Sequence, residues 1–146
     1  MSASTHSDPS CIFCRIVAGQ IPALKILEDD RALAFLDVGP LADGHMLLIP
    51  KDHHRDLRDL PPETLAAISA HLPRLGAAVM QATGATGLNL LQNSGASSGQ
   101  AVFHVHFHLI PRKEGDGLGY RWNAGTYSPG AANAWRQRII DALPSV

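Results

Sequence analysis

The feature that most constrains the fold is the alternation of histidine and apolar residues along residues 103–112, which read FHVHFHLIPR. Successive side chains of a β-strand point to opposite faces, so His104, His106 and His108 share one face, each about 6.6 Å from the next. The apolar residues between them point the other way, into a core. The pattern therefore predicts a strand over residues 102–110, with an open histidine face on one side and a core face on the other.

Apolar periodicity elsewhere predicts four more strands and one long helix. The strand candidates are residues 23–28, 31–37, 45–49 and 88–92, and short turns between the first three favour antiparallel pairing. A helix is expected to begin near Pro62 and to end at Gly84, with Pro73 kinking or splitting it. Shorter helices are expected near both termini, over residues 11–19 and 133–143. The expected fold class is α+β, a five-stranded antiparallel sheet with one long helix across a face.

Composition and charge exclude several classes of function. The chain has 146 residues, enough for one domain, and a formal net charge of −1, which leaves no basic field for duplex nucleic acid. No apolar run approaches the roughly 20 residues of a membrane helix. Residues 1–10 are polar and are expected to form a disordered tail rather than a signal peptide, which predicts a cytoplasmic protein. Residues 11–112 are expected to form the domain, and residues 113–146 an extension packed on it.

The loop before the histidine strand, NSGASSGQ at residues 93–100, favours phosphate chemistry. Gly95 and Gly99 let the backbone approach a ligand and aim amides at phosphate oxygens, while Asn93 and Gln100 add neutral donors. Taken alone, the three histidines also fit a polar strand face without chemistry, or a three-histidine zinc site. With the loop beside them, the favoured hypothesis is that one histidine is a nucleophile and its neighbours are donors.

The two cysteines, Cys11 and Cys14, have the spacing of a zinc knuckle, which needs two further ligands for a closed tetrahedral site. A redox pair is the first alternative, although such a pair usually follows a strand and here follows a polar tail. Free cysteines of the core are the second alternative.

The chain resembles the histidine triad family of nucleotide hydrolases and transferases, because residues 104–110 match that family's His-apolar-His-apolar-His-apolar-apolar signature. Four segments follow in the family's order: CIFCRIVAGQIPA, EDDRALAFLD, GHMLLIPKDH and NSGASSGQAVFHVHFHLIPR. The resemblance covers residues 11–112 and does not extend to residues 113–146. It implies an enzyme that cleaves at the α-phosphate of a purine nucleotide (an AMP phosphoramidate, an AMP ester or a dinucleoside polyphosphate) through a covalent nucleotidyl-histidine. A nucleotide-binding module with little turnover, or a metal-dependent hydrolase using the three histidines together, are the alternatives.

The resemblance also implies roles for individual residues. His106 would be the nucleophile, His108 would hold phosphate oxygens and assist the leaving group, His45 would support the site, and His104 would complete the catalytic set. Asp37 matches the acid that binds the ribose. The other implied nucleotide-binding residues are Phe13, Ile16, Phe35, Val38, Asn93, Gly99, Gln100, Ala101 and Val102. Many members carry Ser where this chain has Ala101, so proton transfer to the leaving group shifts to His108 or water.

A structural zinc ion and a homodimer are further implications of the resemblance. The implied zinc ligands are Cys11, Cys14, His53 and His104, with His54 as a rival to His53. Four protein ligands leave no open position, so this zinc would not activate water. Residues 115–127 carry Tyr120, Trp122 and Tyr127, and either reach the site and set leaving-group choice or form a floppy tail.

Overall fold

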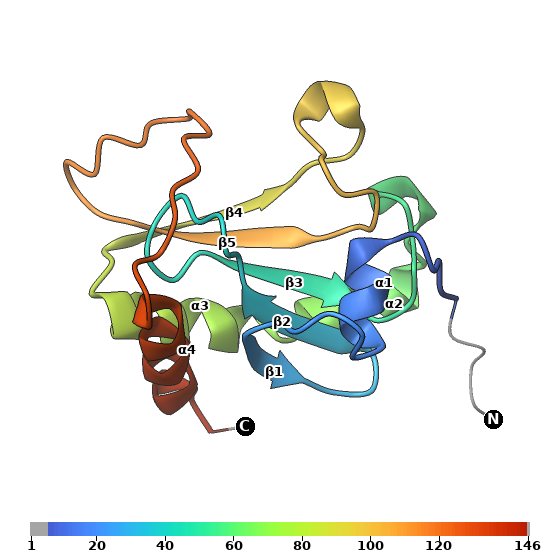
Figure 1. Ribbon diagram of the computed structural model, residues 1–146, viewed down its shortest axis with the longest axis horizontal. Helices are drawn as coiled ribbons and strands as arrows, with labels where there is room; N and C mark the ends of the chain where they lie inside the picture. The colour runs from blue at the N-terminus through green and yellow to red at the C-terminus, as the bar shows by residue number, and fades with distance from the viewer. Residues whose placement is uncertain (1–5, 146) are drawn as a thin grey trace.

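The computed structural model describes residues 6–145, so the first half of the expected tail lies outside the described residues. The five strands form one antiparallel sheet in the order β1-β2-β3-β5-β4, which confirms the predicted α+β class (Figure 1). The elements are α1 (Ile12–Val17), β1 (Lys25–Glu28), β2 (Ala32–Leu36), β3 (Met46–Pro50), the 3-10 helix η1 (Leu57–Asp59), α2 (Pro62–Ser69), α3 (Leu72–Thr83), β4 (Gly87–Gln92), the 3-10 helix η2 (Ala96–Ser98), β5 (Phe107–Arg112) and α4 (Ala131–Ala142).

The helix predicted from Pro62 is split in two. Helix α2 ends at Ser69, and α3 begins at Leu72 with Pro73 in its first turn. Proline removes a backbone donor and clashes with the preceding turn, so a continuous helix cannot pass through it. The predicted end holds, because Gly84 caps α3 in the left-handed conformation with φ of 73°.

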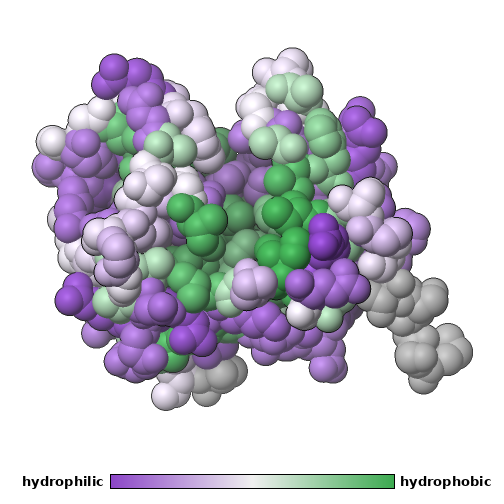
Figure 2. Space-filling view, viewed as in Figure 1, coloured by the Kyte–Doolittle hydropathy of each residue, from purple (hydrophilic) through white to green (hydrophobic). Residues whose placement is uncertain are grey.

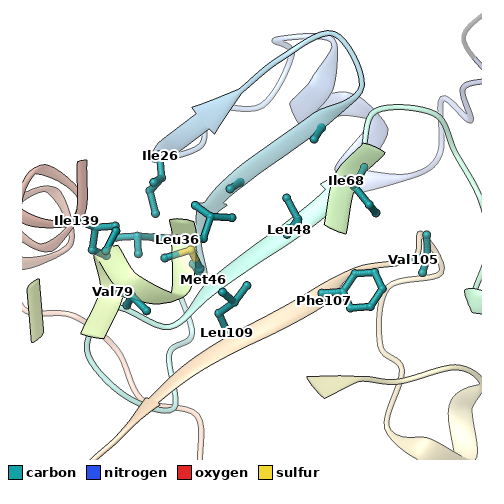
Figure 3. Close-up of a cluster of buried hydrophobic side chains, with 14 of the residues drawn as sticks. Ile26, Leu36, Met46, Leu48, Ile68, Val79, Val105, Phe107, Leu109 and Ile139 are labelled. Atoms are coloured by element: carbon teal, nitrogen blue, oxygen red, sulfur yellow. The ribbon is translucent and has the colours of Figure 1, made fainter. Parts of the chain in front are cut away.

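Helices cover both faces of the sheet, which explains why β2 and β3 are buried along their whole length. One face packs against α2, α3 and α4, and this layer forms the larger core. Figure 3 shows Val105, Phe107 and Leu109 in that layer beside Leu48 and Ile68. The opposite face packs against α1, whose Phe13 and Ile16 meet β2 and β3. The predicted apolar side of the histidine segment therefore faces the larger core.

Strand β5 begins at Phe107, so the strand predicted over residues 102–110 was placed too early. The β3–β5 register pairs Leu48 with Phe107, and continuing it would bring Val105 opposite Pro50. Proline has no N–H to donate to a ladder. The Val105 N–H instead donates to the His54 carbonyl at 2.7 Å, outside the sheet. His104 and His106 thus lie on an irregular segment that leads into the strand.

The histidine face was also predicted to be open, and this was wrong. His104, His106 and His108 are 0%, 6% and 5% exposed. Helix α1 lies over the first two through Phe13, and Trp122 contacts the third. Both covering elements are distant in sequence from the histidines, so the alternation pattern alone gave no sign of them.

The segment between β5 and α4 folds back along the molecule and is fixed at both ends. Near its start Arg112 holds Asp116 through two hydrogen bonds of 2.8 and 3.0 Å. Near its end the Gly44 N–H donates to the Tyr127 hydroxyl at 2.9 Å. Gly44 has φ of 89° and a Cβ there would lie 2.8 Å from Thr83, so only glycine fits. Within residues 6–145, no helix has the length and apolar character needed to span a membrane.

Candidate active site

The ring of His106 is oriented by its own backbone neighbour. Its Nδ1 lies 2.7 Å from the carbonyl oxygen of His104. A carbonyl only accepts, so Nδ1 carries the proton and the Nε2 lone pair is free. Burial lowers the pKa of His106 from its ordinary value, and the Asp37 charge and the bond to the His104 carbonyl oppose this only in part. The neutral imidazole with a free Nε2 is the nucleophilic form.

A second chain of hydrogen bonds fixes the proton on His108. The Leu41 N–H donates to Nδ1 of His45 at 3.0 Å, so the proton of neutral His45 is on Nε2. That Nε2–H donates to Nδ1 of His108 at 2.9 Å. The proton of neutral His108 is therefore on Nε2. Burial, with smaller contributions from the charges of His106 and His45, lowers the pKa of His108 to about 3. His108 is thus a neutral hydrogen-bond donor at pH 7.

Asp37 lies at the end of β2, beside His45. Its Oδ1 accepts the Gly39 N–H at 2.8 Å, and its Oδ2 lies 3.6 Å from Nε2 of His45. The carboxylate keeps 21% of its side-chain surface exposed, so it remains available to a ligand. Burial lowers the pKa of His45 despite the nearby charge of Asp37. This part of the site therefore holds one negative charge beside neutral imidazoles.

These groups line a cavity of about 360 Å³. Figure 2 shows the hollowed face with apolar residues inside the hollow. Most residues that the sequence predicted for the nucleotide line this one cavity, although Val38 is 72% exposed at its edge. They are Phe13, Ile16, Phe35, Asp37, Val38, Gly99, Ala101, Val102, His106 and His108. An apolar slot with a few converging polar groups is typical of small-molecule sites.

Two of the residues predicted to bind the nucleotide lie apart from this cavity. Gln100 is 4% exposed, and its amide donates to the carbonyls of Arg55 and Val102 while its oxygen accepts the Gly95 N–H. Its side chain therefore holds the loop in shape. Asn93 lines a neighbouring cavity that shares Gly99 with the first.

Trp122 is the site residue that the sequence placed least firmly. Its ring centroid lies 4.9 Å from that of His108 and 5.8 Å from that of His45. Of the two alternatives for residues 115–127, the structure has the one in which the segment reaches the site. Sequence analysis missed the Leu41 N–H and the Pro50 carbonyl altogether, because backbone groups leave no residue-type signal.

A second cluster lies behind the triad. Its members are Cys11, Cys14, His53 and His104, whose ligand atoms all lie within 4.8 Å of one another. Nδ1 of His104 lies 3.5 Å from Sγ of Cys11 and 3.6 Å from Sγ of Cys14. Nδ1 of His53 lies 3.3 Å from Sγ of Cys14. Ligands at about 2.0–2.3 Å from a tetrahedral zinc are roughly 3.6 Å apart, so the donor set fits zinc.

The surroundings of the cluster also fit a metal. Nε2 of His104 donates to the Pro50 carbonyl at 2.8 Å, which leaves its Nδ1 lone pair facing the sulfurs. His53 belongs to the cluster, whereas its rival His54 does not. The three triad histidines do not form a common cluster among the described residues, which disfavours a three-histidine metal site.

Comparison with known proteins gives consistent matches. A profile described as the HIT domain matches residues 18–115. The chain is 48% identical over 108 residues to an adenylylsulfatase from Arabidopsis thaliana; the match covers 74% of this chain and 55% of that protein, about half its length. It is 44% identical over 135 residues to an adenosine 5'-monophosphoramidase from Schizosaccharomyces pombe, covering 92% and 98%. A Zn-bound histidine triad family protein from Mycobacterium smegmatis has a similar structure, with a TM-score of 0.81, 39% identity, and 91% and 92% coverage.

Proposed function

The chain belongs to the HIT domain family, and we propose that it is a nucleotide hydrolase or transferase that cleaves at the α-phosphate of a purine nucleotide. One observation carries the proposal: a neutral His106 with a free Nε2 lies in the wall of a nucleotide-sized cavity. The named relatives act as an adenylylsulfatase and as an adenosine 5'-monophosphoramidase, which supports hydrolysis of an adenosine 5'-phosphoryl compound.

In the first step Nε2 of His106 attacks the α-phosphorus. A bond forms between this nitrogen and phosphorus, and the bond from phosphorus to the leaving group breaks, so the electron pair departs with the leaving group. The His104 carbonyl keeps its hydrogen bond to Nδ1 and stabilises the positive charge that the ring acquires. The ring needs no reorientation during attack, because that hydrogen bond is already made.

His108 and the loop stabilise the charge on the phosphoryl oxygens. The Nε2–H of His108 donates to a non-bridging oxygen, and the backbone amides of Ala101 and Val102 contribute at the same side of the cavity. An amine leaving group also needs a proton. Ala101 has no hydroxyl, so that proton comes from His108 or from water.

In the second step water attacks the phosphorus of the nucleotidyl-histidine. The bond from phosphorus to His106 breaks, AMP leaves, and the proton released from water passes to solvent. If an alcohol or amine replaces water, the same intermediate gives transfer instead of hydrolysis. Two displacements of modest difficulty thus replace a single difficult one.

Asp37 and the apolar slot give the nucleoside its orientation. The Asp37 carboxylate accepts hydrogen bonds from both ribose hydroxyls, while the base lies in the apolar slot against Phe13 and Phe35, which pack edge-on against one another with ring centroids 5.5 Å apart. Contacts of this kind recognise the sugar and an aromatic base without reading every edge of that base.

We propose that the second cluster holds a structural zinc ion. The metal would tie α1 and Cys11 just before it to the segment that carries His106. The backbone at His6, before α1, already lies beside His53 of the cluster, because the His53 N–H donates to the His6 carbonyl. All four donors come from the protein, so the cluster serves the reaction by fixing His104.

The central experiment measures AMP release from adenosine 5'-phosphoramidate and from diadenosine polyphosphates. His106→Ala should lower the rate at least about a thousandfold, as removal of a nucleophile does. His71→Ala is the matched control, because His71 pairs with Asp29 at the junction of α2 and α3 and does not line the cavity. Wild-type enzyme quenched in denaturant at alkaline pH, where the phosphorus–nitrogen bond of a nucleotidyl-histidine survives, should carry one adenylyl group by mass spectrometry. Equal AMP release by wild type and His106→Ala would overturn the proposal, and tight AMP binding without turnover or adduct would indicate a nucleotide-binding module.

We further propose that residues 11–112 with their extension 113–146 act as one domain of a cytoplasmic homodimer. Strand β4 is an edge of the sheet and carries Leu90, which is 52% exposed. Such an edge favours association with a second copy. Light scattering of wild type and Leu90→Glu tests the dimer, since the charged edge should lower the measured mass by half.

A further inference from the structure

A second cavity, of about 760 Å³, opens beside the proposed nucleotide cavity. The two cavities share Gly99, Ala101 and Trp122. These residues border the place where the phosphorus lies beside His106 in the proposed reaction. A substrate can therefore extend from the first cavity into the second across this border, and the group beyond the phosphorus is the one that enters.

The second cavity has an uncompensated positive charge. Two arginines, Arg112 and Arg121, are among its lining residues, and in the described part of the chain none of those residues is a carboxylate. Arg112 is neutralised, because Asp116 accepts two hydrogen bonds from its guanidinium. Its remaining contacts, to Asn89 at 2.7 Å and to the Gly119 carbonyl at 3.2 Å, hold the wall together.

Arg121 differs from Arg112 in having no acidic partner among residues 6–145. Its guanidinium donates to one backbone group, the Gly117 carbonyl, at 3.1 Å. Asp116, the nearest acid along the segment, accepts hydrogen bonds from Arg112 and from the N–H groups of Lys113 and Leu118. The guanidinium of Arg121 therefore keeps its charge and most of its donors for a ligand.

Resting on the proposed function, we infer that this cavity receives the leaving group and that Arg121 makes the enzyme select an anionic one. A carboxylate, phosphate or sulfate on the leaving group gains attraction from Arg121, whereas an ammonium group meets repulsion. The amides of Asn89 and Asn93 in the same wall add neutral donors that suit an anion. An uncharged leaving group also enters the cavity, but it gains no electrostatic attraction from Arg121.

Three adenosine 5'-phosphoramidates test the inference, because they share one scissile bond and differ in the distal group. The amines are β-alanine, propylamine and 1,3-diaminopropane, which end in a carboxylate, a methyl group and an ammonium group. For the wild type, kcat/KM should fall in that order, by about five- to tenfold from first to last, as expected for a partly exposed charge. The difference in kcat/KM among the three substrates should shrink at high ionic strength, because salt screens the interaction between Arg121 and the distal charge.

Substitutions then identify the residue responsible. Arg121→Gln should bring the carboxylate and ammonium substrates to within about twofold of one another, and Arg121→Lys should keep their order. Lys113→Gln removes the same charge from the same segment at a residue outside the cavity, and should keep the wild-type preference.

Equal rates for all three substrates with wild type would overturn the inference, as would a preference that survives Arg121→Gln. Either result leaves the proposed reaction intact. Absence of any turnover of the propylamine compound, or turnover that persists in His106→Ala, would instead overturn the proposed function itself.

Discussion

His104 contributes its carbonyl oxygen to Nδ1 of His106 at 2.7 Å and its own ring to the cluster of two cysteines and His53. One residue therefore belongs to both centres. Any displacement of its backbone changes the direction in which Nε2 of His106 points. The proposed metal site and the proposed nucleophile are consequently coupled over a single residue.

Removal of the metal should lower both stability and activity. We expect about one zinc ion per chain, and exhaustive chelation should lower Tm by roughly 10 °C, as follows from loss of a ligand present far above its Kd. Metal content, thermal unfolding and AMP release are measured on the same samples. The control is Cys14→Ser treated identically, whose Tm should already be low and should change little. An enzyme stripped of zinc that keeps its Tm and its activity would contradict the coupling.

His45 should act through His108 rather than on the substrate. It is fully buried between the Leu41 N–H and Nδ1 of His108, so His45→Ala frees the His108 ring to rotate. We expect kcat to fall about ten- to hundredfold, the usual effect of removing an orienting hydrogen bond, with a smaller change in KM. His71→Ala serves again as the control for loss of a histidine. A large rise in KM at constant kcat would mean that His45 binds substrate directly.

Stability should depend on pH through His108, because folding lowers its pKa from an ordinary 6.5 to about 3. The unfolded chain then binds more protons than the folded chain between these two values. The stabilisation is fully present above pH 6.5 and declines as pH falls toward 3, by up to about 1.4 kcal/mol per pH unit for this one group. Urea unfolding between pH 4.5 and 6.5 measures the slope. His108→Gln should reduce this slope by the equivalent of up to one bound proton. Identical slopes for wild type and His108→Gln would refute the prediction.

Gln100 should matter for loop structure more than for direct phosphate contact. Gln100→Ala leaves partly buried carbonyls and an N–H without partners and should cost about 1–3 kcal/mol of unfolding free energy. Gln100→Glu should be worse, because a carboxylate oxygen would face the carbonyls of Arg55 and Val102. Urea unfolding and the KM for adenosine 5'-phosphoramidate are both measured. Unchanged stability with a lost catalytic rate would instead assign Gln100 to the phosphate.

The fold could be predicted largely because its signals are local. Alternation of apolar residues predicted that Val105, Phe107 and Leu109 lie in the core. Pro73 predicted the break in the helix, and it lies in the same segment as that break. The start of β5 could not be predicted in the same way. It depends on Pro50, a residue of another strand that has no N–H to offer at the facing position.

The site residues also fall into those that a local sequence signal predicts and those that depend on distant parts of the chain. Residues that a motif identifies, such as Asp37 and His108, lie together in one cavity. Trp122 lies in the same cavity because the segment that carries it is held by the Arg112–Asp116 contact near its start and by the distant contact of Tyr127 with Gly44 near its end. The proton positions on the histidines depend on backbone groups, which no residue pattern encodes.

The tautomers of this site are set by the main chain, through the carbonyls of Pro50 and His104 and the N–H of Leu41. Side-chain replacements in the cavity wall leave these three peptide groups in place. Natural drift or deliberate redesign can therefore exchange the walls around a new substrate while the imidazoles keep their protonation pattern. This makes the scaffold a robust starting point for altering specificity.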